Sequence, residues 1–345
     1  MAKKGAKEDI VDGLKIDSKL ISTLEKEFGN ISRTGREVRD ATKNRHVIPI
    51  SPAHDMALGG GIPEGSWVLI SGDEKTGKSS SCLSLIRNAQ KPEHGSRHTL
   101  YLDTEGRLKD MLLDGIHGLN QDMMTIISSD EKPLPAEEFL RIAEAYMKDN
   151  DGLIVVIDSI SSLIPARDLA EEMSGERRPG LPKLLSNFTK RLAGIVPRKN
   201  HVVMMVTHFI ANLGAVGNAP KYVADGGTKI RYQADTMMEV SYTQGWEDSD
   251  KNQIGQIVHW KIGCSAAGGK PRTQYTSYLR YGYGIDEEFE IIAEAVNLNI
   301  VEKAGSWLSY KEQKFQGMAK FADALRSLPV MKQEIEDQIK ALLCE

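Results

Sequence analysis

Residues 72–79 read Gly72-Asp73-Glu74-Lys75-Thr76-Gly77-Lys78-Ser79, which is a complete G-x-x-x-x-G-K-[ST] phosphate-binding loop. An apolar run over residues 67–70 precedes the loop and predicts a strand. Apolar residues at helical spacing follow from Cys82 to Ile86, and they predict a helix that begins near Lys78. This order of strand, loop and helix predicts that the chain binds a nucleoside triphosphate. The alternative is a glycine-rich surface turn.

The loop predicts specific contacts with phosphate. Gly72 and Gly77 are expected to leave room for phosphate oxygens near backbone N–H groups, and the N-terminus of the following helix adds positive potential. Lys78 is expected at the β- and γ-phosphates, and the Ser79 hydroxyl at Mg²⁺. The predicted cofactors are therefore ATP and Mg²⁺. The predicted ATP-binding residues are Gly72, Asp73, Glu74, Lys75, Thr76, Gly77, Lys78, Ser79 and Ser80.

Length and composition are typical of a globular protein. The 345 residues suffice for one large core with small appendages, and 40% of them are apolar. No window approaches the roughly 18 consecutive apolar residues of a membrane span, and the basic N-terminus lacks the apolar stretch of a secretory signal. We therefore expect a cytosolic protein without a membrane partner. The three cysteines, Cys82, Cys264 and Cys344, are far apart, which favours reduced thiols and no zinc site.

Charge is distributed unevenly along the chain. The formal net charge of −4 does not by itself suggest a nucleic-acid binder, because it averages over all faces. Residues 1–45 hold eleven Lys or Arg against eight Asp or Glu, whereas residues 286–345 hold seven against twelve. A basic N-terminal arm and an acidic C-terminal piece therefore flank a mixed core.

Strand and helix patterns alternate through the core. Residues 98–103, 152–158 and 201–208 are apolar runs that predict buried strands, and residues 136–149 and 184–192 have helical patterns. This alternation predicts a parallel sheet with helices on both faces, in which ligands bind off the carboxyl ends of the strands. The polar residues at or just beyond those ends should then converge on the phosphate loop. They are Asp103, Glu105, Asp158 and His208.

Three of these residues have candidate roles in hydrolysis. Asp158 has the position of the acid that orients Mg²⁺ and its water, with Ser79 as the second metal-binding residue; capping of the next helix is the alternative. Glu105 is the candidate general base or water-orienting group, and a solvated loop acid is the alternative. His208 is either a sensor of the γ-phosphate or a satisfied histidine at the end of a strand.

Taken in this order, these residues resemble the RecA recombinase family. The similarity extends to residues 24–29, to the lead-in at 55–65, and to the Gly-Gly segment at 226–232. Its most specific part is Ile300 to Lys311, which resembles the family's entry into its C-terminal domain. Thr207-His208 stands where bacterial members usually have Gln, and it is closer to phage-type, UvsX-like homologues. Residues 106–111 show no clear match to the family's adenine contacts.

The resemblance implies a fold and a function. The fold class is α/β: a RecA-type P-loop ATPase core (46–285) with a mostly parallel sheet flanked by helices, an N-terminal helical arm and linker (1–45), and a small α+β C-terminal domain (286–345). The implied function is a DNA-dependent ATPase that forms a helical filament on single-stranded DNA and pairs it with homologous double-stranded DNA. Further expected partners are a single-strand-binding protein and a loading mediator. The expected location is the cytoplasm, in association with the nucleoid, and it would be the host cytoplasm if the protein is encoded by a phage. A hexameric helicase and a non-motor ATP switch are the alternatives.

Two segments rich in Gly, Pro and charge, residues 165–182 and 211–229, lack apolar periodicity and follow predicted strands. The resemblance implies that they are the two loops that hold DNA, through phosphate contacts and apolar wedges between bases. For the first segment, whose charges are mixed, a solvated loop is the alternative. The candidate DNA-binding residues are Arg167, Met173, Arg177, Arg178, Ile210, Lys221, Gly226, Gly227, Thr228, Lys229 and Arg231.

Two features bear on contacts between subunits. Lys261 ends a β-type run, and its ordinary interpretation is a surface lysine. The resemblance instead implies that Lys261 reaches the phosphates of ATP bound to the neighbouring subunit, where the family has a second lysine in place of His259. The candidate catalytic residues are thus Glu105, Lys78, Lys261 and His208. A helix predicted over residues 16–28 has one apolar face, which in the family docks on the adjacent protomer.

Overall fold

The computed structural model describes residues 18–343, except Asn30, Asn44 and residues 130–131, 171–179, 212–221 and 226–227. The chain separates into two packed units, one ending at Arg45 and one beginning at His46. In the described part of the chain, no helix has both the length and the apolar character that crossing a bilayer requires.

The N-terminal unit contains α1 (Ser18–Phe28) and α2 (Gly35–Lys43). The described part of the predicted 16–28 helix is α1, and it leaves Leu20 58% and Phe28 64% exposed. The start of α2 is capped reciprocally, because the Thr34 N–H donates to the Glu37 carboxylate and the Glu37 N–H donates to the Thr34 hydroxyl. Because Leu20 and Phe28 are exposed, the apolar face of α1 can contact another surface.

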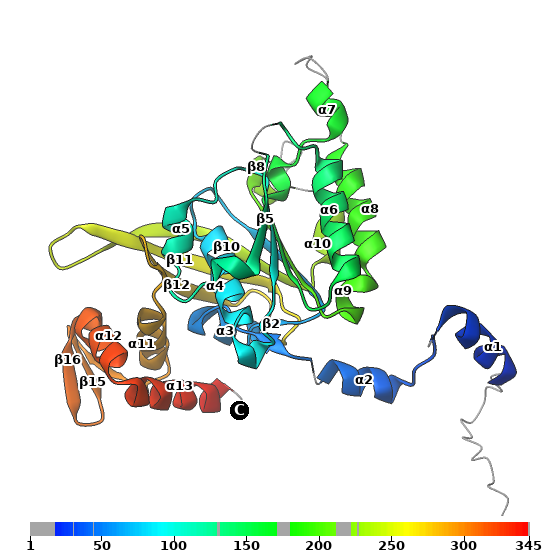
Figure 1. Cartoon of the computed structure of the whole chain (residues 1–345). Helices are drawn as coiled ribbons and strands as arrows, with labels where there is room; N and C mark the ends of the chain where they lie inside the picture. Colours follow the sequence, from blue (N-terminus) through cyan, green and yellow to red (C-terminus); the bar gives the residue numbers. More distant parts are fainter. Residues whose placement is uncertain are drawn as a thin grey trace, which may run out of the picture. The chain divides into compact units, whose positions relative to one another are not determined.

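The second unit is built on a twisted sheet that has nine strands in the described residues (Figure 1). Six neighbouring strands run parallel, and the remaining ones continue the sheet as antiparallel strands. The mostly parallel core predicted from the sequence is therefore confirmed. The order is β13 (Gly284–Ile285), β12 (Gln274–Arg280), β11 (Gln253–Cys264), β10 (Thr236–Glu247), β3 (Ser66–Ser71), β7 (Val202–Thr207), β6 (Ile154–Asp158), β4 (Thr99–Asp103) and β5 (Met124–Ile127).

The central strands are buried on both sides. In β3, Val68 and Ile70 belong to the apolar cluster on one face, while Trp67 and Leu69 belong to the cluster on the other. This alternation follows from strand geometry, in which successive side chains point to opposite faces. A continuous apolar run is what such a doubly covered strand requires.

Helices cover both faces of the sheet (Figure 1). One face packs against α3 (Pro52–Leu58), α4 (Lys78–Ala89) and α5 (Asp110–Asp114). The other packs against α6 (Ala136–Asp149), α8 (Leu181–Leu192), α9 (Ile195–Arg198) and α10 (Thr228–Gln233). The predicted helix at 184–192 begins earlier, at Leu181, because Pro182 fits the first turn of a helix.

Residues 165–182 and 211–229, which lack apolar periodicity in the sequence, contain short regular elements where the structure describes them. In the first, α7 (Ala166–Ala170) forms one turn after Pro165, whose carbonyl accepts hydrogen bonds from two N–H groups of the turn. In the second, β8 (Phe209–Ala211) pairs antiparallel with β9 (Tyr222–Ala224), and α10 begins at Thr228. Elements this short carry too few residues to show a period in the sequence.

Short elements complete the core. β1 (Val47–Ile48) pairs with β2 (Ile62–Pro63). Three 3-10 turns, η1 (Pro92–His94), η2 (Gln121–Met123) and η3 (Ile160–Ser162), lie in the described connections between strands and helices.

The C-terminal part packs a small antiparallel sheet on three helices. The sheet contains β14 (Glu302–Ala304), β15 (Trp307–Tyr310) and β16 (Gln313–Gln316), and the helices are α11 (Glu287–Asn297), α12 (Gly317–Ser327) and α13 (Pro329–Leu343). Leu308 and Tyr310 point into an apolar cluster with helix residues, whereas Trp307 is half exposed. The sequence segment 300–311 thus forms the hairpin that starts this small sheet.

Two buried carboxylates join the C-terminal part to the core. Asp286 accepts the Phe289 N–H at the start of α11 and forms ion pairs with Arg280 and Arg326. Glu290 is fully buried and accepts hydrogen bonds from the Ser277 hydroxyl and, at 3.0 Å, from the Ala53 N–H. Burial raises the pKa of Glu290 from 4.5 to about 7.

Because its folded pKa is raised, Glu290 should make unfolding depend on pH. The protonated carboxyl stabilises the fold fully below pH 4.5, and this contribution is lost as pH rises through about 7. At about 1.4 kcal/mol per pKa unit, the loss amounts to up to about 3 kcal/mol. Glu290→Gln should remove this dependence, which urea unfolding of wild type and variant between about pH 5 and 8 measures. A free-energy difference between the two proteins that stays constant over this range would contradict the prediction.

Candidate nucleotide-binding site

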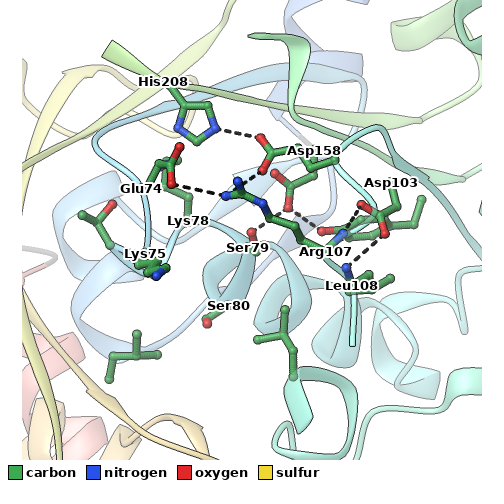
Figure 2. Close-up of a pocket in the computed structure, with 16 residues that line it drawn as sticks. Glu74, Lys75, Lys78, Ser79, Ser80, Asp103, Arg107, Leu108, Asp158 and His208 are labelled. Atoms are coloured by element: carbon green, nitrogen blue, oxygen red, sulfur yellow. Dashed lines mark hydrogen bonds and ion pairs between the residues drawn. The ribbon is translucent and has the colours of Figure 1, made fainter. Parts of the chain in front are cut away.

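The carboxyl ends of β3, β4, β6 and β7 meet at one edge of the sheet, and a pocket opens there (Figure 2). The structure brings most of the predicted site residues together around this pocket, although Gly72 and Asp73 are not in its lining. Those in its lining are Glu74, Lys75, Thr76, Gly77, Lys78, Ser79, Ser80, Asp103, Glu105, Asp158 and His208. Sequence reasoning did not single out Tyr101, Arg107, Leu108, Leu112 and Leu279, which also line it.

The phosphate loop ends at Gly77, whose φ of 87° lies in the left-handed region that glycine adopts without strain. α4 starts at the next residue, so its first N–H groups face the pocket. The buried Lys78 ammonium donates to the Gly72 carbonyl at 2.9 Å and to the Asp73 carbonyl. Burial lowers the pKa of Lys78, and the charge of Asp158 opposes this shift. Backbone carbonyl groups of the loop thus fix the position of the Lys78 ammonium group.

Gly72 has a packing constraint that the sequence does not reveal. A Cβ atom there would lie 2.8 Å from Cβ of Val240, a residue of the neighbouring strand β10. Close packing of the loop on β10 therefore requires Gly72, and the expected room for phosphate at this glycine stays a prediction. Sequence reasoning could not find this contact, because it joins residues that are far apart in the chain.

The predicted metal-binding residues Asp158 and Ser79 lie in hydrogen-bonding contact in this pocket. The Ser79 hydroxyl donates to Oδ2 of Asp158 at 2.6 Å, and the Tyr101 hydroxyl donates to the same oxygen at 2.6 Å. Burial raises the pKa of Asp158, and these two hydrogen bonds oppose that shift. A hydroxyl and a carboxylate are hard oxygen donors, and Mg²⁺ commonly binds few protein groups because it keeps several waters. The residues therefore fit Mg²⁺, which would screen phosphate charge when bound.

Glu105 lies in a cluster of hydrogen-bond donors. Its Oε1 atom is 2.8 Å from Nε2 of His208, 2.6 Å from the Ser159 hydroxyl and 3.1 Å from the Ser162 hydroxyl. The His208 hydrogen bond is the main cause that lowers the pKa of Glu105 from 4.5 to about 2. An acid with so low a pKa is a weak proton acceptor, which favours the water-orienting role for Glu105 over that of general base.

His208 connects this cluster to the next segment of the chain. Its Nδ1 atom is buried and has no hydrogen-bond partner within the described ranges. The backbone N–H of His208 donates to the Ser161 hydroxyl at 3.0 Å, and β8 begins at the following residue. His208 therefore links Glu105, through its side chain, to the start of β8, through its backbone.

The interface candidate Lys261 does not line this pocket. It lies in β11, opposite Glu239 of β10 and Gln274 of β12. Its action on the ATP of a neighbouring subunit remains a prediction.

The candidate DNA-binding residues that the structure describes lie beyond the same sheet edge or in α10. Arg167 is in α7, Ile210 in β8 is 46% exposed, and Lys229 and Arg231 are exposed on α10, which begins at Thr228. The other candidates lie outside the described residues: Met173, Arg177, Arg178, Lys221, Gly226 and Gly227.

Comparison with known proteins matches nearly the whole chain. Residues 15–286 match the family model of the RecA N-terminal domain, and residues 289–343 match that of the RecA C-terminal domain. A RecA protein from Laribacter hongkongensis is 30% identical over 333 residues, which covers 95% of this chain and 91% of that protein. RecA proteins from Dichelobacter nodosus and Xanthomonas euvesicatoria are 29% and 30% identical and cover 93% and 94% of this chain, with 89% and 92% of their own lengths.

The site predicts that nucleotide binding and hydrolysis can be separated. Glu105→Gln keeps the phosphate loop and Asp158, so it should bind ATP and lose hydrolysis by about 10²-fold or more. Asp158→Asn should instead weaken Mg²⁺-dependent ATP binding, because the metal loses its anionic ligand. Calorimetric ATP titration and phosphate release measure the two effects. Wild-type hydrolysis by the Glu105 variant would remove Glu105 from this role.

Proposed function

This chain belongs to the RecA family, so it acts in DNA recombination and repair as a DNA-dependent ATPase, and we propose that it forms helical filaments on single-stranded DNA. In these filaments it would pair the bound strand with homologous duplex and exchange strands. Its relation to phage-type homologues belongs to the same proposal.

The observation that carries this proposal is the path from Glu105 through His208 to β8. A terminal phosphate next to Glu105 would compete for its hydrogen-bond donors, and His208, 2.8 Å away, is one of them. Because β8 follows His208 directly, a shift of His208 would be passed on to β8, which contains the DNA candidate Ile210. ATP binding and DNA binding would then favour the same conformation.

Filament growth needs contacts between copies of the chain. The apolar face of α1, with Leu20 and Phe28 exposed, is suited to packing on a neighbouring copy. We propose that Lys261 contacts the ATP phosphates of that neighbour. ATP would then stabilise the interface, and loss of the γ-phosphate would weaken it.

Electron microscopy of the full chain with ATP, Mg²⁺ and single-stranded DNA tests this function, and we expect helical filaments. Lys78→Ala should form none, because the phosphates lose their principal cation. Lys261→Ala should bind nucleotide as a free protomer but fail to assemble. Closed rings would instead indicate a hexameric helicase, and the absence of any assembly would indicate a non-motor ATP switch.

The DNA contacts should appear in the salt dependence of binding. Each phosphate contact on a single strand contributes about −0.7 to the slope of log affinity against log salt. If Lys229 and Arg231 each contact one phosphate, replacing both with Ala should reduce the slope by about 1.4 for every base sequence alike.

Fluorescence anisotropy with labelled oligonucleotides at several salt concentrations measures this slope. Preserved ATP binding in the same variant excludes a folding defect. An unchanged slope, or a loss confined to particular base sequences, would mean that these two cations do not contact the DNA backbone.

A further inference from the structure

Arg107 lines the nucleotide pocket and reaches towards Glu74 of the phosphate loop (Figure 2). The same side chain also contacts Glu105. Its Nη1 atom is 3.3 Å from Oε2 of Glu74 on the phosphate loop and 3.4 Å from Oε2 of Glu105. One guanidinium group thus joins the loop that would hold the phosphates to the carboxylate that would orient water.

The backbone of Arg107 is fixed, while its side chain is exposed. The buried Asp103 carboxylate accepts the Arg107 N–H at 3.1 Å with one oxygen and the Leu108 N–H at 3.0 Å with the other. The Arg107 side chain beyond this anchor is 59% exposed. A held backbone with an exposed side chain allows the guanidinium to change partners without moving the strand.

The chemistry of the pocket favours such a change. Lys78, Ser79 and Glu105 line the same pocket as Arg107, so a triphosphate held by the loop brings anionic oxygens among these groups. A guanidinium is always charged and presents a planar fork of donors that matches phosphate geometry. A terminal phosphate carries more charge than either carboxylate and would compete for this cation.

Taking the proposed ATPase site as given, we propose that Arg107 leaves Glu74 and Glu105 when ATP binds and contacts the γ-phosphate within its own subunit. Arg107 then discriminates ATP from ADP, because ADP lacks the group that it contacts. Its departure also frees Glu105 to orient water only when a γ-phosphate is present.

The ordinary alternative is a surface ion pair without a role in binding. Exposed pairs contribute little to stability, so the resting contacts of Arg107 do not oppose its release strongly. The two interpretations differ in what they predict for ATP and for ADP, and binding measurements can therefore separate them.

The test measures dissociation constants of the full chain for a non-hydrolysable ATP analogue and for ADP, each with Mg²⁺, by calorimetry. Arg107→Ala should weaken binding of the analogue about tenfold or more, the usual cost of a lost charged hydrogen bond, and binding of ADP less than about twofold. Arg107→Lys should fall between these, because it keeps the charge and loses the fork. Arg141→Ala removes another exposed arginine, which pairs with Glu138 on α6, and should change neither constant.

A double-mutant cycle with Glu74 gives a second readout. Glu74→Gln removes one resting partner of Arg107 and should strengthen binding of the ATP analogue. If this gain comes through the release of Arg107, it should disappear when Arg107 is already Ala. A gain of equal size in both backgrounds would overturn the exchange of partners.

Two outcomes of the binding assay would also overturn the inference: an unchanged constant for the ATP analogue, or equal losses for the analogue and ADP. Lys78→Ala distinguishes such a failure from failure of the proposed site itself. If Lys78→Ala binds both nucleotides like wild type, the phosphate loop is not the binding site and the proposed function fails. If Lys78→Ala loses both while Arg107→Ala loses neither, only the role of Arg107 is rejected.

Discussion

Burial of the central strands on both faces is the constraint on which the rest of this structure depends. β3, β7, β6 and β4 have apolar side chains on both sides, so polar groups can stand only at the strand ends. Because these strands run parallel, their carboxyl ends share one edge. The phosphate loop, Glu105, Asp158 and His208 are therefore assembled by the same packing that forms the core.

Much of this arrangement could be predicted from the sequence, because the signals are local. The phosphate loop is a contiguous motif, and each buried strand is a continuous apolar run that ends in a polar residue. What the sequence did not reveal depends on contacts between distant residues. Close packing against Val240 requires glycine at position 72. Tyr101 lies in the site because its hydroxyl donates to the same Asp158 oxygen as the Ser79 hydroxyl. No sequence motif marks Arg107, because its backbone is held by a hydrogen bond to the side chain of Asp103.

The site also shows how a polar cluster can be stable and responsive at once. In the described structure Lys78 is held by loop carbonyls, and Glu105 is held by His208 and two serines. Each of these bonds satisfies a partly buried polar group, which would otherwise cost free energy. A ligand that offers the same groups better partners can therefore rearrange the cluster without leaving a charge unpaired.

The buried link at Glu290 has a consequence for how the molecule unfolds. Its carboxyl group joins α11 of the C-terminal part to Ser277 of β12 and to the first turn of α3 in the core. Separating these parts would expose this carboxyl, and it would also remove the partners that Asp286 gives to Arg280 and Arg326. Although two family segments meet between residues 286 and 289, these shared bonds should couple unfolding of the C-terminal part to unfolding of the core.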